Sequence, residues 1–177
     1  MTDRQPEISI RAAGPADADI LSRVGAESFA AAYQATTTAE DIVAHIDAHF
    51  SSTAIRDAMA NTSCHYLLAS VDAEPAGLLK LRDNPCPVEI PDKAAAEIQL
   101  VYILPGFQRL GLGARLIDAA IRRAGDQGLN SVWLSAWEHA DWALNFYLKA
   151  GFRRVGTQEF RVGATAYTDH VMWLPFD

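Results

Sequence analysis

Apolar residues recur along the chain at two spacings, and each spacing predicts a type of element. Helical spacing, with apolar side chains three or four residues apart, predicts helices at 15–33, 38–50, 112–124 and 142–150. Short apolar runs between turn residues predict strands at 8–11, 66–71, 76–81, 98–104, 132–136, 152–155 and 167–174. In the third helix the apolar stripe of Leu112, Leu116, Ile117, Ala120 and Ile121 is especially clear.

The order of these elements predicts the fold class. Two helices follow a first strand, and then come strands, a strand–helix–strand–helix–strand stretch and a final strand. This mixture predicts an α/β or α+β sheet with helices on its faces. Residues 83–93 contain three prolines and predict an irregular loop. No repeat or linker divides the chain, so residues 1–177 are expected to form a single domain.

Composition narrows the partners. Half of the residues are apolar and 21% are charged, which is typical of a globular protein with a core. The net charge of −7 argues against nucleic acid, which selects a basic face. The N-terminus lacks an apolar signal segment and no run of apolar residues is long enough to span a membrane, so we expect a cytoplasmic protein. Cys64 and Cys86 have no metal-type spacing, and a disulfide is not expected between them.

Charge is distributed unevenly. Residues 1–88 carry six basic and twelve acidic side chains, whereas residues 89–177 carry nine and ten. The first half would therefore tolerate a cationic ligand, and the second half could hold an anion.

A glycine-containing turn, Gln108-Arg109-Leu110-Gly111-Leu112-Gly113, joins a predicted strand to a predicted helix. The free N–H groups and the dipole at a helix N-terminus suit a phosphate, and glycine lets a ligand approach the backbone closely. The basic side chains of the helix, Arg115 to Arg123, favour a polyphosphate ligand. Neither a Walker loop nor a dinucleotide fingerprint fits, because Leu112-Gly113 and Leu116 occupy the required Lys-Ser/Thr and glycine positions. An ordinary strand-to-helix turn is the alternative.

Two motifs in register resemble the GNAT acetyltransferase superfamily. Residues 108–113 match its Q/R-x-x-G-x-G/A loop, and Ala143, Phe146, Tyr147, Gly151 and Phe152 match its A-x-x-F-Y-x-x-x-G-F block. The resemblance covers essentially the whole chain. It implies a mixed, mostly antiparallel sheet of about seven strands with about four helices, and acetyl-CoA as cosubstrate. Residues 132–139 and 168–172 also resemble the bacterial spermidine/spermine N-acetyltransferase branch, which implies a polyamine acceptor.

The resemblance assigns cosubstrate contacts residue by residue. The phosphate loop would comprise Gln108, Arg109, Leu110, Gly111, Leu112, Gly113 and Ala114. The backbone of Val101, Tyr102 and Ile103 would hold the pantetheine arm and the thioester oxygen. The family often has an asparagine where this chain has Ala140, so that contact is absent, and Asn145 one turn later is the substitute candidate.

Acetyl transfer to an amine needs a neutral amine, a stabilised carbonyl oxygen and a proton donor for the departing thiolate. The resemblance gives the donor role to Tyr147, although the apolar stripe from Trp142 to Ala150 would also suit a core tyrosine. Glu97 is the candidate base, and strand alternation is expected to place it on one face with Gln99, Val101 and Ile103. The alternatives are a water chain, or a surface carboxylate beside Asp92 and Lys93.

The histidines give weaker signals. His45 and His49 are spaced i, i+4, but no third ligand follows, so no metal site is expected. His139, next to Glu138, is a further candidate for proton transfer.

These observations predict an acetyl-CoA-dependent N-acetyltransferase that acts on a polyamine or other small amine by direct attack in a ternary complex. The alternatives are a protein N-terminal or lysine acetyltransferase, and a non-catalytic CoA-binding sensor. A homodimer is expected by family analogy.

Overall fold

The protein was analysed as a computed structural model that describes residues 5–91 and 94–176. These residues form five α-helices: α1 (Ala18–Tyr33), α2 (Ala39–His49), α3 (Ser52–Ala60), α4 (Leu112–Asp126) and α5 (Asp141–Lys149). The seven strands are β1 (Ile8–Ala13), β2 (Cys64–Val71), β3 (Glu74–Arg82), β4 (Ala95–Ile103), β5 (Ser131–Trp137), β6 (Arg153–Val162) and β7 (Thr165–Pro175). Short 3₁₀ turns precede α1 and α4.

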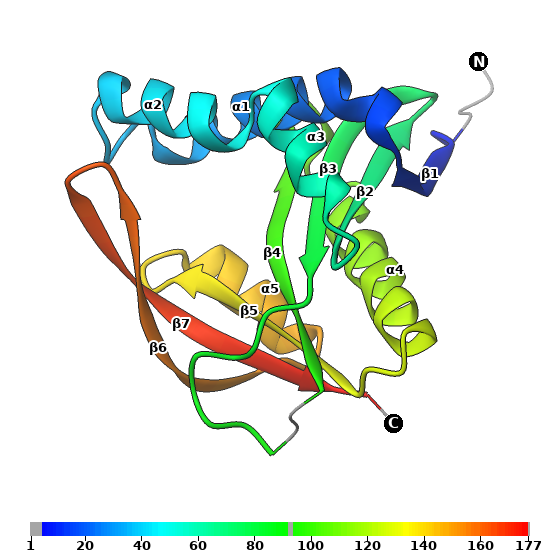
Figure 1. Ribbon diagram of the computed structural model, residues 1–177, viewed down its shortest axis with the longest axis vertical. Coiled ribbons are helices and arrows are strands. Elements are labelled where there is room, and N and C mark those ends of the chain that lie inside the picture. The colour runs from blue at the N-terminus through cyan, green and yellow to red at the C-terminus, as the bar shows by residue number, and fades with distance from the viewer. Residues whose placement is uncertain (1–4, 92–93, 177) are drawn as a thin grey trace.

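All seven strands belong to one sheet, in the order β1-β2-β3-β4-β5-β7-β6. Neighbouring strands are antiparallel except β4 and β5, which are parallel and connected through α4. Figure 1 shows α1, α2 and α3 on one side of the sheet and α4 and α5 on the other. The predicted mixed, mostly antiparallel fold is therefore confirmed.

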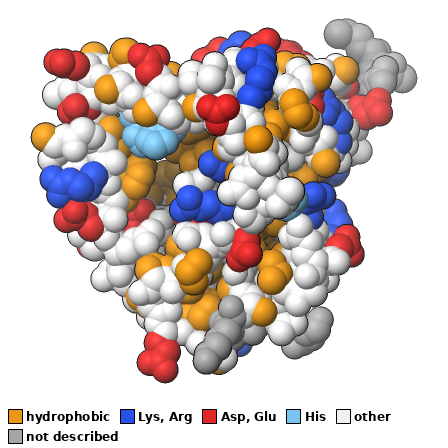
Figure 2. All heavy atoms as spheres, viewed as in Figure 1, with side chains coloured by type: hydrophobic (Ala, Val, Ile, Leu, Met, Phe, Trp, Pro, Cys, Tyr) orange, Lys and Arg blue, Asp and Glu red, His pale blue; other side chains and the backbone are white. Residues whose placement is uncertain are grey.

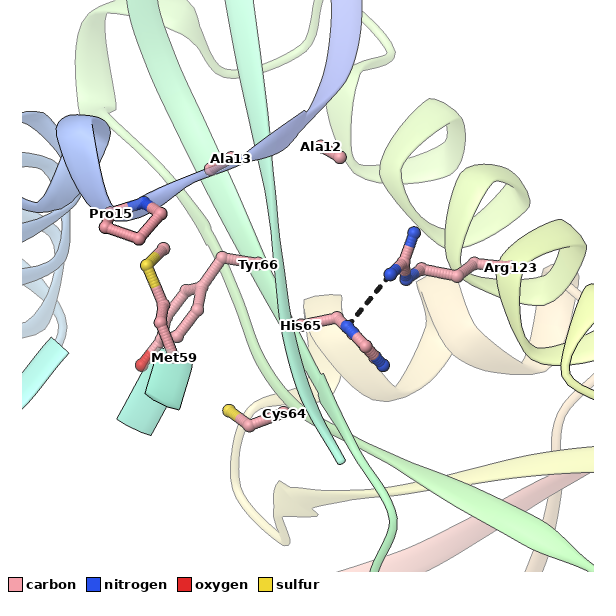
Figure 3. A pocket seen from close by; sticks show the side chains of 8 residues that line it. All are labelled: Ala12, Ala13, Pro15, Met59, Cys64, His65, Tyr66 and Arg123. Atoms are coloured by element: carbon pink, nitrogen blue, oxygen red, sulfur yellow. Dashed lines mark hydrogen bonds between the residues drawn. The ribbon is translucent and has the colours of Figure 1, made fainter. Parts of the chain in front are cut away.

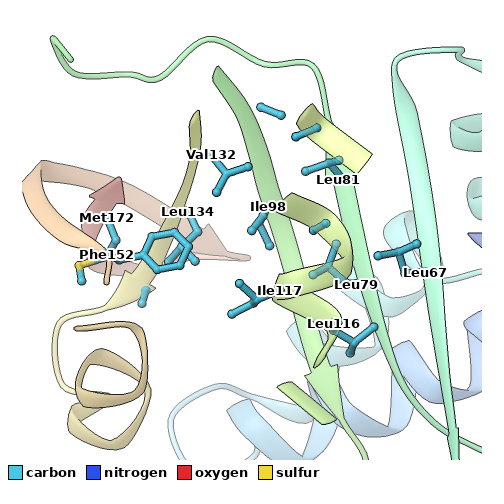
Figure 4. Close-up of a cluster of buried hydrophobic side chains, with 14 of the residues drawn as sticks. Leu67, Leu79, Leu81, Ile98, Leu116, Ile117, Val132, Leu134, Phe152 and Met172 are labelled. Carbon is cyan, nitrogen blue, oxygen red and sulfur yellow. The ribbon is translucent and has the colours of Figure 1, made fainter. Parts of the chain in front are cut away.

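The main core lies between the sheet and the pair α4 and α5. Its side chains come from α4, from β2 to β5, from β7 and from the end of α5 (Figure 4). Leu116 and Ile117 of α4 are almost fully buried there, as the helical periodicity predicts. Burial of one such side chain stabilises the fold by about 1.5–3 kcal/mol, so this contact fixes α4 on the sheet.

Strand β4 bends in its middle. Its parallel pairing with β5 covers Ala95, Ala96 and Glu97 and then stops. On its other edge Leu81 pairs with Ile98 but Lys80 pairs with Leu100, so Gln99 is an extra, bulged residue. A bulge bends a strand and increases its twist. Strand β4 therefore turns away from β5, and the two strands open into a V in Figure 1.

Several element boundaries differ from the predicted ones. Helix α3 was not predicted: it has nine residues, and its apolar face consists of the buried Ile55 and the partly buried Ala58 and Met59. Ser51 caps this helix by accepting a hydrogen bond from the Ala54 N–H. Strand β6 extends to Val162, well beyond the predicted end at 155. Residues 83–91 contain no helix or strand, as the prolines predict. Asp92 and Lys93 lie outside the described residues.

The cysteines and the apolar character of the helices can be compared with the expectations from the sequence. Cys64 and Cys86 are free thiols. Among the described residues, no helix combines the length and the apolar character that crossing a membrane requires.

Candidate active site

The opening between β4 and β5 exposes backbone of β4. Adjacent residues of a strand direct their N–H and C=O groups to opposite edges. In the described chain, residues 98–103 pair with β3 on one edge and have no ladder partner on the edge that faces β5. The predicted backbone contacts Val101, Tyr102 and Ile103 all belong to this segment. Its free N–H and C=O groups can bind an extended ligand that enters between the strands.

The turn before α4 leaves its amides available. The N-cap residue, Gly111, has a positive φ of 78° and no side chain to cap the helix. The first N–H groups of a helix have no partner within it, and no acidic side chain occupies the first turn of α4. Arg109 also has a positive φ, of 66°, and is exposed. This turn fits a phosphate group, as the sequence predicts.

The two sequence motifs meet in space. A Cβ atom added at Gly113 would lie 3.3 Å from the ring of Phe146 on α5. Phe146 and Tyr147 both pack against the main core, as do Val101 and Ile103 of the open strand. The N-terminus of α4, helix α5 and the free edge of β4 therefore surround one space.

Tyr147 combines a packed ring with a free hydroxyl. Its ring lies edge-on to Phe146 and Phe152, with centroids 5.3 and 5.7 Å away. No hydrogen bond within the described residues engages its hydroxyl. Burial raises the pKa of Tyr147 to about 12, so the hydroxyl keeps its proton at neutral pH. The stripe that would make Tyr147 an ordinary core residue is incomplete, because Trp142 is 78% exposed.

Tyr102 links the two sides of the opening. Its ring packs with residues of α1 and α3, on the face opposite to Tyr147. Burial raises the pKa of Tyr102 well above its usual value, and the nearby Tyr33, Tyr147 and Asp169 raise it further. Tyr102 and Tyr147 therefore lie on opposite faces of the sheet near the opening between β4 and β5.

The side chain of Glu97 lies on the same side of the sheet as that of Tyr102, because the bulge at Gln99 interrupts the alternation along β4. The expected placement of Glu97 with Val101 and Ile103 is wrong: those two side chains pack toward α4. Glu97 is also no surface carboxylate, since it is only 6% exposed. One of its oxygens, Oε2, accepts hydrogen bonds from the Arg82 guanidinium and, at 2.8 Å, from the Asn84 amide.

The sequence analysis missed Asp169, a buried carboxylate on β7. It is 6% exposed; its Oδ2 accepts a hydrogen bond of 3.0 Å from the Ser135 hydroxyl, and its Oδ1 is buried without a partner. Burial raises the pKa of Asp169. The sequence did contain a signal, because alternation gives β7 a buried row of Tyr167, Asp169, Val171 and Trp173 in which one residue is charged.

An aromatic cluster adjoins Asp169 on the same face. Tyr167 lies edge-on to Tyr33 and to Trp137, with centroids 5.5 and 5.6 Å away, and Phe160 completes the group. Figure 2 shows this face hollowed between the helical layer and the sheet, with histidine side chains at the upper rim.

The histidines take structural positions. His45 stacks on Phe29 at 4.2 Å, and burial together with the nearby His49 lowers the pKa of His45 to about 4. In residues 5–91 and 94–176 no group of three or more His, Cys, Asp or Glu side chains could hold a metal ion. The side chain of His139 is 71% exposed and its ring lies edge-on to Trp137.

Some predicted contributors lie away from the opening. Arg123 is near the far end of α4, where its guanidinium is 2.9 Å from His65 Nδ1 at a shallow pocket of about 140 Å³ (Figure 3). No residue lining that pocket comes from β4, β5, α5 or β7. Arg123 therefore does not contribute to the phosphate turn. On α5, Asn145 is exposed and Ala140 is the N-cap, with no side-chain hydrogen bond.

Comparison with known proteins agrees with this geometry. The sequence model of the Acetyltransferase (GNAT) family matches residues 27–152. An uncharacterized N-acetyltransferase of Mycobacterium tuberculosis is 31% identical over 156 residues, which cover 88% of this chain and 96% of the relative. An uncharacterized N-acetyltransferase of Lactobacillus delbrueckii subsp. lactis is 28% identical, over 84% of this chain and 86% of the relative.

Solved structures share the fold. The PaiA N-acetyltransferase of Thermoplasma acidophilum, in complex with coenzyme A, superposes with a TM-score of 0.79 at 21% identity and covers 96% of this chain and 99% of its own. The yncA acetyltransferase of Salmonella typhimurium, with acetyl-CoA, gives a TM-score of 0.66 at 16% identity, over 96% and 94% of the two chains. The opened sheet with an amide-lined turn defines an acyltransferase. The chain belongs to the acetyltransferase (GNAT) family.

Proposed function

We propose that the protein transfers the acetyl group of acetyl-CoA to a primary amine on a small molecule, with a polyamine as the preferred acceptor. The observation that carries this proposal is the open edge of β4, which lies between the amide-lined turn of α4 and the free hydroxyl of Tyr147. Acetyl-CoA would supply an activated acyl group and a good leaving thiolate.

The chain can hold acetyl-CoA mainly through backbone groups. Residues 108–114 would bind the phosphates, because their N–H groups and the dipole of α4 favour negative charge. The free N–H groups of residues 101–103 would hold the pantetheine arm and stabilise the charge that develops on the thioester oxygen. Asn145 is exposed on α5, where it could reach the cosubstrate from the other side.

Tyr147 is proposed to protonate the departing sulfur. Its free, protonated hydroxyl and its position on α5 beside Phe146 support that role. Glu97 is proposed as the base, directly or through a water that it orients. Its Oε2 already accepts two hydrogen bonds, so its other oxygen, Oε1, would take part.

The polyamine preference rests on two features. Residues 132–139 and 168–172 belong largely to β5 and β7, which border the hollow, and these are the segments that resemble the polyamine branch. The acidic first half of the chain would attract a cationic acceptor. Action on a small molecule in the cytoplasm and assembly as a homodimer are parts of the same proposal.

The test measures CoA-thiol release from acetyl-CoA with spermidine, spermine, short alkylamines and N-terminal peptides. We expect release that depends on the polyamines. Release with peptides alone would replace the proposed acceptor by a protein terminus. Binding of acetyl-CoA without release for any acceptor would identify a CoA sensor.

A further inference from the structure

Asp169 has a combination of features that folding alone does not explain. A buried carboxylate is destabilising unless hydrogen bonds or an opposite charge compensate it. Asp169 receives one hydrogen bond from Ser135, and its second oxygen is buried with no partner in the described residues. An unpaired buried polar group is uncommon in native proteins, and a functional role is one explanation for it. Asp169 is the one carboxylate among the buried unpaired groups of the described residues.

The surroundings of Asp169 suit a cation. Tyr33, Trp137 and Tyr167 form aromatic walls on its face of the sheet, and the faces of aromatic rings attract ammonium groups. Trp137 is the ladder partner of Asp169, and Tyr167, two residues away on the same face of β7, contacts Tyr33. An ammonium ion here would meet a carboxylate oxygen and π-electron density together.

No cation of the described chain already neutralises Asp169. Its ladder partners are the neutral Trp137 on β5 and the neutral Gln158 on β6, while α1 and β4 contribute the phenols of Tyr33 and Tyr102. His170, the next residue on β7, is the titratable group that favours the charged form of Asp169.

Two cations of this face of the sheet, Lys80 and Arg82, are held elsewhere. Lys80 lies over the Tyr66 ring and Arg82 pairs with Glu97, both on β3, with β4 and β5 between them and β7.

We infer that Asp169 and the aromatic walls of Tyr33, Trp137 and Tyr167 form the binding site for the acceptor ammonium group, and that Asp169 accepts its first proton. The inference rests on the proposed amine acetylation and names the residue that would recognise and activate the amine. It assigns the role of base to Asp169 in place of Glu97, whose ion pair with Arg82 then serves to hold β3 and β4 together.

The proton balance is complete. The ammonium gives one proton to the Asp169 carboxylate, and the neutral amine attacks the thioester carbon. A carbon–nitrogen bond forms, the carbon–sulfur bond breaks, and the sulfur takes the electron pair and a proton from Tyr147. The second proton of the amine nitrogen restores Tyr147, and Asp169 releases its proton to solvent. The products are the acetamide, CoA thiol and one proton.

The test compares the wild type with Asp169→Asn, which keeps the shape and an acceptor for Ser135 but removes the charge. We expect kcat/KM for the amine to fall about 10²-fold. The acid limb of its pH profile should disappear, while acetyl-CoA affinity measured by calorimetry should not change. Asp126→Asn, on the exposed end of α4, is the matched control and should behave as the wild type. Ser135→Ala removes a hydrogen bond that lowers the pKa of Asp169, so it should move the acid limb to higher pH and leave the plateau rate.

Spermidine and n-butylamine serve as acceptors, and n-butanol serves as the neutral isostere in binding measurements with the CoA-loaded protein. Acetylation of butylamine but not of spermidine would refute the polyamine preference. The role of Asp169 would then be tested by comparing kcat/KM for butylamine between the wild type and Asp169→Asn. If no amine is acetylated, the binding measurements still test the site. Binding of the amines but not of butanol, together with loss of amine binding in Asp169→Asn, would support it. Asp169→Asn with unchanged kcat/KM and pH profile would overturn the inference, as would absence of amine binding to an inactive wild type.

Discussion

The two faces of the opened sheet are built in different ways. On the face of α4 and α5, most of the proposed acetyl-CoA contacts come from two short stretches, 108–114 and 143–152, and would act largely through exposed backbone. On the face of α1 and α2, the partly buried Tyr33, Tyr102 and Trp137 and the buried Asp169 come from four distant parts of the chain, and they would act through their side chains. A local motif can describe the first face, whereas the second exists only after folding.

The two faces also differ in the penalty for an unpaired group. An exposed amide at the turn of α4 can bind water when the ligand is absent, so leaving it without a protein partner costs little free energy. A carboxylate buried between aromatic side chains cannot bind bulk water instead, so its hydrogen-bond partners must come from the fold or from the ligand. Glu97 has its partners from the fold, and Asp169 lacks one.

The largest effect expected of a single change on the buried face follows from removing the partner of Glu97. Arg82→Met leaves that carboxylate buried without a cation, and we expect a loss of about 2–3 kcal/mol in the free energy of unfolding, since the 37% exposure of Arg82 weakens the pair. Arg161→Met, which breaks the exposed pair with Glu159, should change it by less than about 1 kcal/mol. Urea titration of both variants decides this. Equal losses in the free energy of unfolding would mean that the ion pair of Glu97 stabilises the fold no more than an exposed ion pair does.

On the opposite face, Tyr147→Phe should lower kcat about 10²-fold with little change in acetyl-CoA affinity or stability, because the hydroxyl has no partner in the described chain. Tyr66→Phe is the matched control, as Tyr66 is a buried tyrosine against α3 and far along the sheet from α5. Steady-state kinetics with acetyl-CoA and the best acceptor test this. Unchanged turnover would remove Tyr147 from the mechanism.

The backbone basis of the acetyl-CoA face can be tested at its turn. Gly111→Ala forces a side chain into a left-handed conformation and should cost about 1–2 kcal/mol in stability, with acetyl-CoA binding weakened about tenfold by the displaced amides. Gly106→Ala lies in the same connection, has open space around its Cβ and no positive φ, and should change neither quantity appreciably. Calorimetric titration of both variants compares them. Equal affinities would show that the turn does not hold the phosphates.

The smallest effect concerns the pH dependence of stability. Because burial raises the pKa of Asp169 in the folded state, its stabilising contribution is present at low pH and declines as the pH rises from about 3.9 through the raised value. The Asp169→Asn variant has no ionisable group at this position, so its stability does not decline for this reason as the pH rises. The stability of the variant relative to the wild type should therefore increase between pH 4 and pH 7, as measured by urea titration at each pH. A constant difference would mean that Asp169 ionises as an exposed aspartate does.

Much of the fold could be predicted from the sequence. The stripe of α4 and the prolines of residues 83–91 act locally, so those elements were predicted correctly. Helix α3 was missed because it is short: in nine residues, the spacing of Ile55, Ala58 and Met59 completes little more than one helical repeat. The end of β6 was set too early, because that strand extends as part of a hairpin with β7 whose pairing runs to Val162 and Thr165.

By itself the sequence predicted the family and the mixed sheet and located the segments proposed to face acetyl-CoA, because glycine conformation, helix termini and apolar periodicity are properties of short stretches of chain. The tertiary structure alone decided where the carboxylates lie. One bulged residue, Gln99, moved Glu97 to the face opposite to the expected one, and the docking of β7 beside β5 enclosed Asp169 among aromatic rings from α1 and β5. Burial and desolvation depend on neighbours distant in sequence, so no local pattern could have identified which carboxylate was left without a partner.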